Sequence, residues 1–353
     1  MIAVVSMAGA AFLWEAERPD EPSIAGRVVG PAGQPVANAS VRTPDGRLAR
    51  TTSGGRFHLD GDPAWVTVTA DGWISRSRVV APGETNLVRL ARRLPGTVTF
   101  AFGGDVMFGR RYFDARQDGS MQGLLEPDDG PAAHERLLAG VAPMLADADL
   151  TAVNLESPIV EDPAYDPTRR RPESFHPTKE FAFASAPAAA AALRSAGVDV
   201  VDLGNNHLYD RLQSGVQETR RHLASAGLGP GHGSFGAGVN AQQAWAPALR
   251  EANGQRVAFL GCTSAEVAAA PTTVATATKG GAARCRLDRL RRAVEDASRR
   301  ADIVVVMVHG GQNYGRTPSA RSRALTDAAV AAGATMVINQ HPHVAGGLRY
   351  ADG

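Results

Sequence analysis

The sequence contains few of the residues that build disulfide frameworks, thiolate metal sites or strongly charged surfaces. Only two cysteines, Cys262 and Cys285, occur in 353 residues. Two thiols exclude a disulfide framework and a zinc site made of cysteine alone. One disulfide in an oxidising compartment and two buried free thiols both remain compatible with this pair.

Lysine is almost absent, and the overall charge is nearly balanced. The only lysines are Lys179 and Lys279, and the formal net charge is +1. Such a chain has no overall field that would attract nucleic acid, so no nucleic-acid partner is expected. We interpret the arginine bias mainly as a coding preference, with phosphate binding as a second interpretation. The length predicts two domains.

Long apolar runs are also lacking. The first 22 residues contain one run, from Ile2 to Trp14, which is shorter than the roughly 20 residues that span a bilayer. No basic region precedes it and no clear cleavage site follows, which is atypical of a signal peptide. We expect a membrane anchor that is only partly present, and hence a location outside the cytoplasm. A buried N-terminal segment is the alternative.

Residues 23–93 contain short apolar runs separated by turn residues, which predicts a small all-β sandwich. The predicted strands are 24–29, 36–41, 56–59, 65–69 and 74–80. The pattern Gly-x-Pro-Val-x-Asn-Ala-x-Val at Gly33–Val41, with Val66–Trp73, resembles the carboxypeptidase-regulatory-like, transthyretin-like fold. The resemblance implies a structural or carbohydrate-adjacent spacer.

After the hinge Leu94-Pro95-Gly96, residues 97–353 alternate predicted strands with predicted helices. This alternation predicts an α/β domain with a largely parallel sheet, whose active site lies at the carboxyl ends of the strands. The predicted strands are 98–102, 150–153, 198–203, 257–260, 303–308 and 336–338, and the predicted helices are 186–196, 215–226, 287–300 and 321–332.

Five of these strands end in residues that can bind metals. Each motif alone is weak, because a single histidine or asparagine after a strand is more often structural. Five of them at equivalent positions predict one site. The candidate ligands are Asp105, Glu156, Asn206, His309, His341 and His343. This mixed oxygen and nitrogen set suits one or two divalent ions of Mn, Fe or Zn better than Ca²⁺.

The order of these motifs resembles the calcineurin-like metallophosphoesterase superfamily. Within it, four segments are similar to the CapA, poly-γ-glutamate-capsule branch: Gly104–Met107, Ala148–Pro158, Asn205–His207 and His341–Val344. The resemblance implies a layered α/β sandwich in which Glu156 bridges two metals and His207 is the general acid or oxyanion-stabilising residue. It further implies positioning roles for Asn154 and Asn205. Arg110 could clamp a phosphate or carboxylate, with an exposed surface charge as the alternative.

Three positions depart from the family pattern. Met107 stands where the superfamily has a histidine ligand, a change that the CapA branch shares. Asn313 stands where the branch usually has glutamate, and Asn339-Gln340 where it usually has Gly-His. These changes predict altered metal affinity or number. Members of the branch normally continue past the position of Gly353, so a fragment is also expected.

Two further segments have alternative interpretations. Gly231–Gly236 matches Gly-x-Gly-x-x-Gly but follows a predicted helix, so a dinucleotide site is not expected. Residues 158–177 have no regular period, and we predict a long loop over the site, with a solvated insertion as the alternative.

The predicted function is that of a metal-dependent phosphoesterase in capsule or poly-γ-glutamate synthesis, with metal-activated water as the nucleophile. Its substrate would be a polymer or a phosphoester. The main alternative is a non-catalytic or degenerate-site subunit of a membrane capsule-synthase complex. A surface module that adheres to polysaccharide through the N-terminal sandwich is a third interpretation.

Overall fold

The computed structural model describes residues 22–265 and 272–351, and the chain divides into two compact units between Arg92 and Arg93. The N-terminal apolar run lies outside the described residues. None of the helices among the described residues is both long enough and apolar enough to cross a lipid bilayer.

The first unit consists of strands in two small sheets, ordered β4-β1-β7 and β3-β2-β5-β6. Its strands are β1 (Ser23–Val29), β2 (Ser40–Arg42), β3 (Leu48–Arg50), β4 (Arg56–Asp60), β5 (Ala64–Thr69), β6 (Arg76–Val80) and β7 (Asn86–Arg89). Alternate residues of these strands, such as Phe57, Leu59, Val66 and Val68, are buried in one core. The period-two pattern of the sequence therefore corresponds to an inner and an outer face.

The second unit contains two four-stranded sheets rather than one. The first has the order β11-β10-β9-β8 and is parallel throughout, and the second has the order β13-β14-β16-β17. In the second sheet only β13 runs antiparallel to its neighbour. The strands are β8 (Phe100–Val106), β9 (Leu150–Leu155), β10 (Val200–Asp202), β11 (Ser234–Phe235), β13 (Ala248–Ala252), β14 (Gln255–Thr263), β16 (Ile303–His309) and β17 (Met336–Gln340), with a small pair of β12 (Ala237–Gly238) and β15 (Gly281–Ala282).

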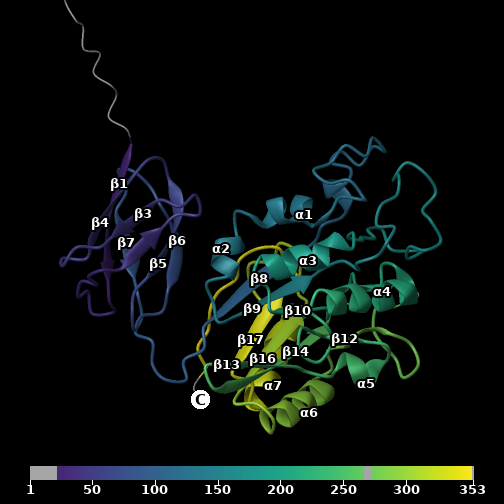
Figure 1. The fold of residues 1–353 in the computed structure, drawn as a ribbon. Coiled ribbons are helices and arrows are strands. Elements are labelled where there is room, and N and C mark those ends of the chain that lie inside the picture. The colour runs from purple at the N-terminus through teal and green to yellow at the C-terminus, as the bar shows by residue number, and fades with distance from the viewer. Residues whose placement is uncertain (1–21, 266–271, 352–353) are drawn as a thin grey trace, which may run out of the picture. The chain divides into compact units, whose positions relative to one another are not determined.

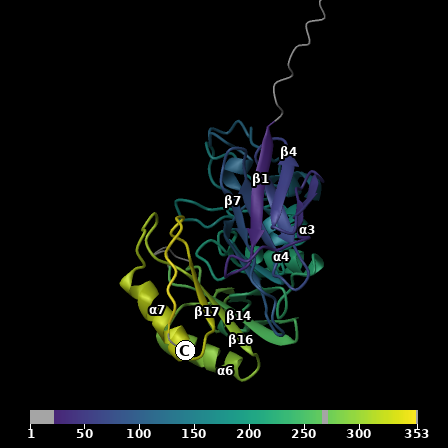
Figure 2. The same ribbon diagram turned by 90° about the vertical axis from the view of Figure 1, so that its left-hand side faces the viewer.

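Helices cover the outer faces of both sheets (Figure 1). One apolar core joins the first sheet to α1, α3 and α4, and a second joins the other sheet to α6 and α7. Figure 2 shows α6 and α7 beside β14, β16 and β17. The helices are α1 (Pro131–Leu138), α2 (Ala142–Leu145), α3 (Ala188–Ser195), α4 (Leu212–Ser225), α5 (Ala241–Ala244), α6 (Leu287–Ser298) and α7 (Ala320–Ala331), with a 3₁₀ turn η1 (Arg110–Tyr112).

A third core lies between the two sheets. Phe259 of β14 contacts Phe100 of β8, with ring centroids 6.2 Å apart, and Phe235 of β11, at 5.7 Å. Strands covered on both faces are apolar throughout, as in Val304–Val308 of β16. The predicted α/β class is therefore confirmed, in a layered arrangement of helices, sheet, sheet and helices.

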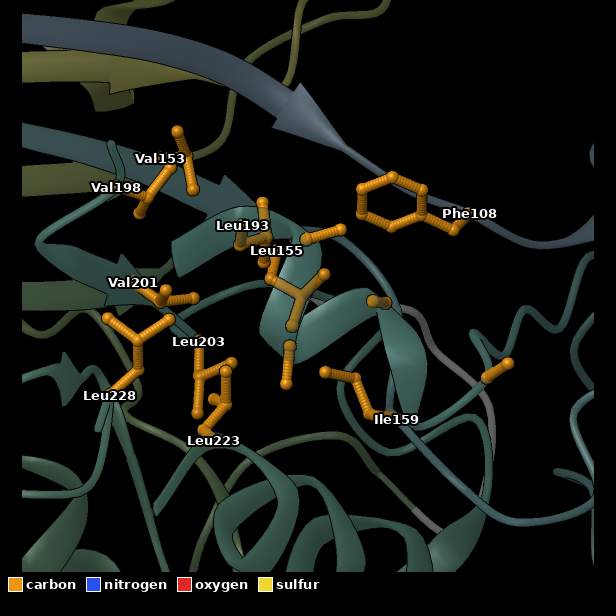
Figure 3. Close-up of a cluster of buried hydrophobic side chains, with 14 of the residues drawn as sticks. Phe108, Val153, Leu155, Ile159, Leu193, Val198, Val201, Leu203, Leu223 and Leu228 are labelled. Carbon is orange, nitrogen blue, oxygen red and sulfur yellow. The ribbon is translucent and has the colours of Figure 1, made fainter. Parts of the chain in front are cut away.

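The core outside the first sheet holds the strands that carry the first half of the candidate site. Figure 3 shows Leu155 of β9 and Leu203, just after β10, close to Leu193 of α3 and Leu223 of α4. All four side chains are almost fully buried. This packing fixes the positions at which β9 and β10 end.

The segment between Pro158 and Ser185 forms a long loop that is closed at its base. The Val160 amide donates to the Ser185 carbonyl over 3.0 Å, and the Ser185 amide donates to the Pro158 carbonyl over 2.8 Å. Phe175 is buried in a small apolar cluster within the loop. The Arg171 guanidinium donates to the carbonyl oxygens of residues 176, 179 and 180. These contacts give the loop a defined conformation.

Cys262 of β14 and Cys285, two residues before α6, form a disulfide. Both cysteines are buried. Of the two arrangements that the sequence left open, the structure has the bridged one.

Candidate metal centre

The two sheets of the second unit contribute different ligand atoms to one place. The oxygen donors come from the first sheet, with Asp105 in β8, Glu156 directly after β9 and Asn206 in the turn after β10. The imidazoles come from the second sheet: His309 ends β16, and the other two follow β17. Because these strands are parallel, their carboxyl ends lie at one edge of the sandwich.

A β-bulge directs the side chain of Asp105 into this site. The register between β8 and β9 pairs Phe102 with Ala152 but Asp105 with Asn154, so β8 carries one extra residue there. Bulges of this kind change the direction of a side chain and are frequent beside active sites. The Gly103-Gly104 pair occupies the irregular position.

All six predicted ligands converge. His309 Nε2 lies 2.8 Å from Asn206 Oδ1, 3.3 Å from Glu156 Oε1 and 3.1 Å from His341 Nδ1. His343 Nε2 lies 3.6 Å from Asp105 Oδ2 and 3.8 Å from Glu156 Oε2. Separations of this size are those expected of atoms that could surround a common cation.

The ligand atoms form two overlapping groups. Glu156, His309 and His341 make one, Asp105, Glu156 and His343 make the other, and in each the donor atoms lie within 4.8 Å of one another. Glu156 belongs to both. The arrangement is compatible with divalent metal binding, because carboxylate, amide and imidazole donors suit the divalent first-row metals.

The electrostatics of the cluster favour a bound cation. Burial, followed by the nearby charge of Glu156, raises the pKa of Asp105. Burial also acts to raise the pKa of Glu156, but the hydrogen bond and charge of His309 outweigh it and lower that pKa. Burial, with the neighbouring His309, lowers the pKa of His341 to about 4. His341 is therefore neutral near pH 7, the state in which imidazole binds metals.

The backbone beside the ligands adopts uncommon conformations. His341 has φ 95° and His343 has φ 58°. Positive φ is costly for residues other than glycine and persists where the surrounding structure enforces it, often at functional sites. The strain points both imidazoles at the cluster.

Comparison with known proteins identifies the family of the second unit. The family model described as bacterial capsule synthesis protein PGA_cap matches residues 99–353. The chain belongs to the PGA_cap family. This confirms the CapA resemblance, while the likeness of the first unit to carboxypeptidase-regulatory-like domains stays a prediction.

The chain is also similar to two curated proteins named CapA. It is 29% identical over 283 residues to the capsule biosynthesis protein CapA of Bacillus anthracis, covering 79% of this chain and 61% of that protein. It is 26% identical over 253 residues to the PGA biosynthesis protein CapA of Bacillus subtilis strain 168, covering 69% of this chain and 57% of that protein. The matched region thus spans about three-fifths of each relative's length.

Two asparagines of the PGA_cap domain support the ligands. Asn154 Nδ2 donates to Asp105 Oδ1 over 2.7 Å and lies 3.2 Å from His309 Nδ1. Asn205 Nδ2 donates to Asn154 Oδ1 over 2.9 Å. The side-chain oxygen Oδ1 of Asn205 accepts from the backbone amide of His207 over 3.0 Å. The pair therefore links the first sheet to the turn that carries Asn206 and His207.

His207 is held by two buried charged residues that the sequence analysis did not single out. Its Nδ1 lies 2.7 Å from Asp210 Oδ2 and 3.0 Å from the Lys179 ammonium. Lys179 also contacts Asp210 directly and donates to the Asn206 carbonyl over 2.9 Å. With Nδ1 engaged, Nε2 is the ring nitrogen left for proton exchange. The rarity of lysine was the only signal in the sequence that marks Lys179.

Arg110 lies beside His207 but does not contact it. The guanidinium is 4.4 Å from the ring centroid of Phe181 and 5.5 Å from that of Phe183. The other neighbour of Phe183 is His207, at a centroid distance of 4.1 Å with the rings 19° from parallel. Phe183 is thus a common neighbour of the cation and the histidine.

The positions that depart from the family pattern have different surroundings. The side-chain amide of Asn339 donates to the Thr326 hydroxyl of α7 over 3.1 Å, so this side chain points away from the cluster. The Gln340 side chain is buried, and its amide has no hydrogen-bond partner among the described residues. Gln340 pairs with His309 across β16 and β17, so an unsatisfied amide adjoins the ligands.

Proposed function

We propose that this protein is a metal-dependent, phosphoesterase-type hydrolase that acts outside the cytoplasm in capsule or poly-γ-glutamate synthesis. The names of the two CapA relatives support the pathway. The Cys262–Cys285 disulfide supports the location, because such bonds persist mainly in oxidising compartments.

The observation that carries the proposal is the membership of Glu156 in both ligand groups. A carboxylate shared in this way is the arrangement expected of a two-metal site. Asp105, Glu156 and His343 would hold one ion, and Glu156, His309, His341 and Asn206 the other. Divalent ions bound there would polarise a phosphoryl oxygen and lower the pKa of a water ligand.

His207 would serve as the general acid. Asp210 and Lys179 fix the ring through Nδ1, so Nε2 can give a proton to the leaving oxygen. Phe183 stacks on the ring and limits its rotation. A positioned acid of this kind contributes roughly 10²–10⁴-fold to the rate.

The second candidate is a non-catalytic subunit of a membrane polymer-synthesis or export complex. Two features favour it: Met107 replaces a histidine ligand of the superfamily, and the Gln340 amide beside the ligands has no partner among the described residues. A thioether binds hard divalent metals poorly, which weakens one metal position.

Metal analysis and a phosphodiesterase assay separate the two candidates. We expect purified protein to hold Mn, Fe or Zn and to hydrolyse a chromogenic phosphodiester in the presence of Mn²⁺. Glu156→Gln should remove both properties, since Glu156 serves both groups. Glu161→Gln is the matched control, because Glu161 is exposed and pairs with Arg221 on the surface.

The outcomes are distinct. Bound metal together with turnover that Glu156→Gln abolishes supports the enzyme. Bound metal without turnover, together with retention of the protein by a membrane synthase, supports the subunit. Protein that binds none of the three metals contradicts the enzyme and is compatible only with a subunit whose metal site is degenerate.

A further inference from the structure

A pocket of about 220 Å³ is lined in part by Phe183, the residue that stacks on His207. It is lined by the segment after β8 and by residues from the whole length of the long loop. Phe113 and Phe175 are buried residues that line it, and Arg110 and Phe181 line it together with Phe183. The lining thus combines aromatic rings with two guanidinium groups, of which that of Arg171 is engaged by backbone carbonyl oxygens of the loop.

The Arg110 guanidinium forms no close ion pair in the part of the chain that the structure describes, although burial lowers its pKa and the charge of Glu180 acts to raise that pKa. No carboxylate of the described residues lies within 4.0 Å of it, and it donates no hydrogen bond to them. Its contacts are the rings of Phe181 and Phe183. A guanidinium that stacks on aromatic faces keeps its N–H edge available for a planar, oxygen-bearing anion.

One acidic side chain of the pocket, that of Glu180, interacts with the charge of Arg110 without forming a close ion pair with it. The Glu180 carboxylate lines the cavity and makes no close ion pair or hydrogen bond with the described residues. Asp114, the other acid there, already accepts from the Gly119 amide over 2.8 Å. A ligand that satisfies both Arg110 and Glu180 needs a carboxylate and a neighbouring N–H donor. That combination is found in an N-acylated amino-acid unit.

The cavity adjoins the proposed reaction centre through a single ring. Phe183 stacks on His207, and its ring centroid also lies 5.5 Å from the Arg110 guanidinium. The Phe183 amide donates to Asp210 Oδ2 over 2.7 Å, the same carboxylate oxygen that approaches His207. Asp210 therefore holds both Phe183, in the wall of the pocket, and His207, the proposed general acid.

We infer that this pocket is a specificity subsite that binds one carboxylate-bearing amino-acid unit of the substrate beside the metal centre. Arg110 binds the carboxylate, the two phenylalanines contact the adjoining carbon atoms, and Glu180 accepts from the N–H group. The claim that this pocket recognises the substrate rests on the proposed function. The claim that it binds a carboxylate-bearing amino-acid unit does not.

Titration with N-acetylalanine, as both enantiomers, tests the subsite by ligand-detected NMR on the full chain. The measurement is made with Mn²⁺ and with EDTA, because binding to Arg110 does not need the metal. We expect at least tenfold weaker binding for the neutral N-acetylalanine amide. Arg110→Gln should weaken N-acetylalanine binding at least tenfold, and Phe181→Leu should weaken it measurably.

Arg111→Gln is the matched control, since Arg111 is an exposed neighbour that does not line the cavity. It should stay within twofold of the unaltered chain. Equal binding by the Arg110→Gln chain, or equal binding of the neutral amide, overturns the subsite. Inorganic phosphate that binds more tightly than N-acetylalanine, in an Arg110-dependent way, overturns the carboxylate assignment. Carboxylate binding in EDTA by a chain without turnover upholds the subsite and contradicts only the proposed hydrolase.

Discussion

The Lys179 ammonium lies 3.0 Å from Nδ1 of His207, and both groups contact the carboxylate of Asp210. All three side chains are buried or nearly so. Burial lowers the pKa of Lys179, against the opposing effect of the Asp210 charge. A buried cation of this kind is retained only with strong partners, and its partner here also orients the proposed catalytic histidine.

Replacing Lys179 should affect both stability and turnover. Lys179→Met leaves Asp210 as a buried charge without its cation, and loss of one member of a buried pair costs about 3–5 kcal/mol. Urea unfolding followed by circular dichroism measures the loss. Lys279→Met is the matched control, because Lys279 is partly exposed over the Tyr209 ring, and a change below about 1 kcal/mol is expected.

The same variant should slow the metal-dependent reaction. Without Lys179, Nδ1 of His207 keeps only Asp210 as a charged partner, and we expect turnover to fall at least tenfold with unchanged metal content. Unchanged turnover in a folded Lys179→Met chain would show that the contact has no part in the reaction.

The two ligand groups share only Glu156, so replacing a ligand that belongs to one group should remove one metal ion rather than both. His341→Ala and His343→Ala each remove a ligand from one group only, so each should lower the metal content by about one ion per chain. Elemental analysis of the dialysed proteins gives the number. His58→Ala, in the first unit, is the control and should change nothing. Equal loss of all metal in both variants would mean a single ion.

Metal removal should also lower thermal stability. A ligand that binds only the folded chain stabilises it by about 2.7 kcal/mol at 100 times its Kd. We expect EDTA to lower the Tm of the unaltered chain and Mn²⁺ to restore it. The Glu156→Gln chain should respond to neither, and a response equal to that of the unaltered chain would place the metal elsewhere.

Asp202 predicts an unusual dependence of stability on pH. It is fully buried in β10, and burial raises its pKa to about 8, although the Gly204 amide donates to it over 2.8 Å. The unfolded value is about 3.9, so the folded chain keeps a proton that the unfolded chain releases between those values. The contribution of Asp202 to stability is therefore complete below pH 4 and declines as pH rises toward 8, by on the order of 5 kcal/mol in total.

Asp202→Asn should remove this dependence, because the amide cannot ionise. The Tm of the Asp202→Asn chain should exceed that of the unaltered chain only slightly at pH 5 and by a larger amount at pH 8. Asp302→Asn is a suitable control: the hydrogen bond from Arg256 lowers the pKa of Asp302 to about 2, so its pH dependence lies below about pH 4 and the substitution should have the same effect at pH 5 and at pH 8. An equal gain at both pH values would contradict a protonated Asp202.

The disulfide should make stability sensitive to reducing agents. A closed loop with a sequence separation of 23 residues predicts about 3 kcal/mol of stabilisation. We expect dithiothreitol to lower the midpoint of urea unfolding by a corresponding amount. The Cys262→Ala/Cys285→Ala chain should be insensitive to the reagent. Alkylation of both cysteines in unreduced, unfolded protein would show that the bond is absent.

Much of the fold and most of the candidate ligands follow from the sequence alone. Helices α4, α6 and α7 and strands β9, β14 and β16 begin or end within a few residues of the predicted bounds, because their apolar periods are long and clear. Short elements such as α2 and β11 were missed, since a few residues carry no period. The six ligands could be found because they end strands, a property that depends on local order along the chain.

Only the tertiary structure decided how those strand ends meet. The alternation of strands and helices predicted one sheet, and only the family resemblance implied a layered sandwich. Packing of Phe259 against Phe100 and Phe235 shows two sheets that face each other and supply different donor atoms. The contacts of Lys179 with His207 and Asp210 join residues about 30 positions apart along an irregular loop. No periodic pattern encodes such a contact, because it depends on how the loop closes over the sheet edge. The same holds for the pocket beside Arg110, whose walls come from two separate segments.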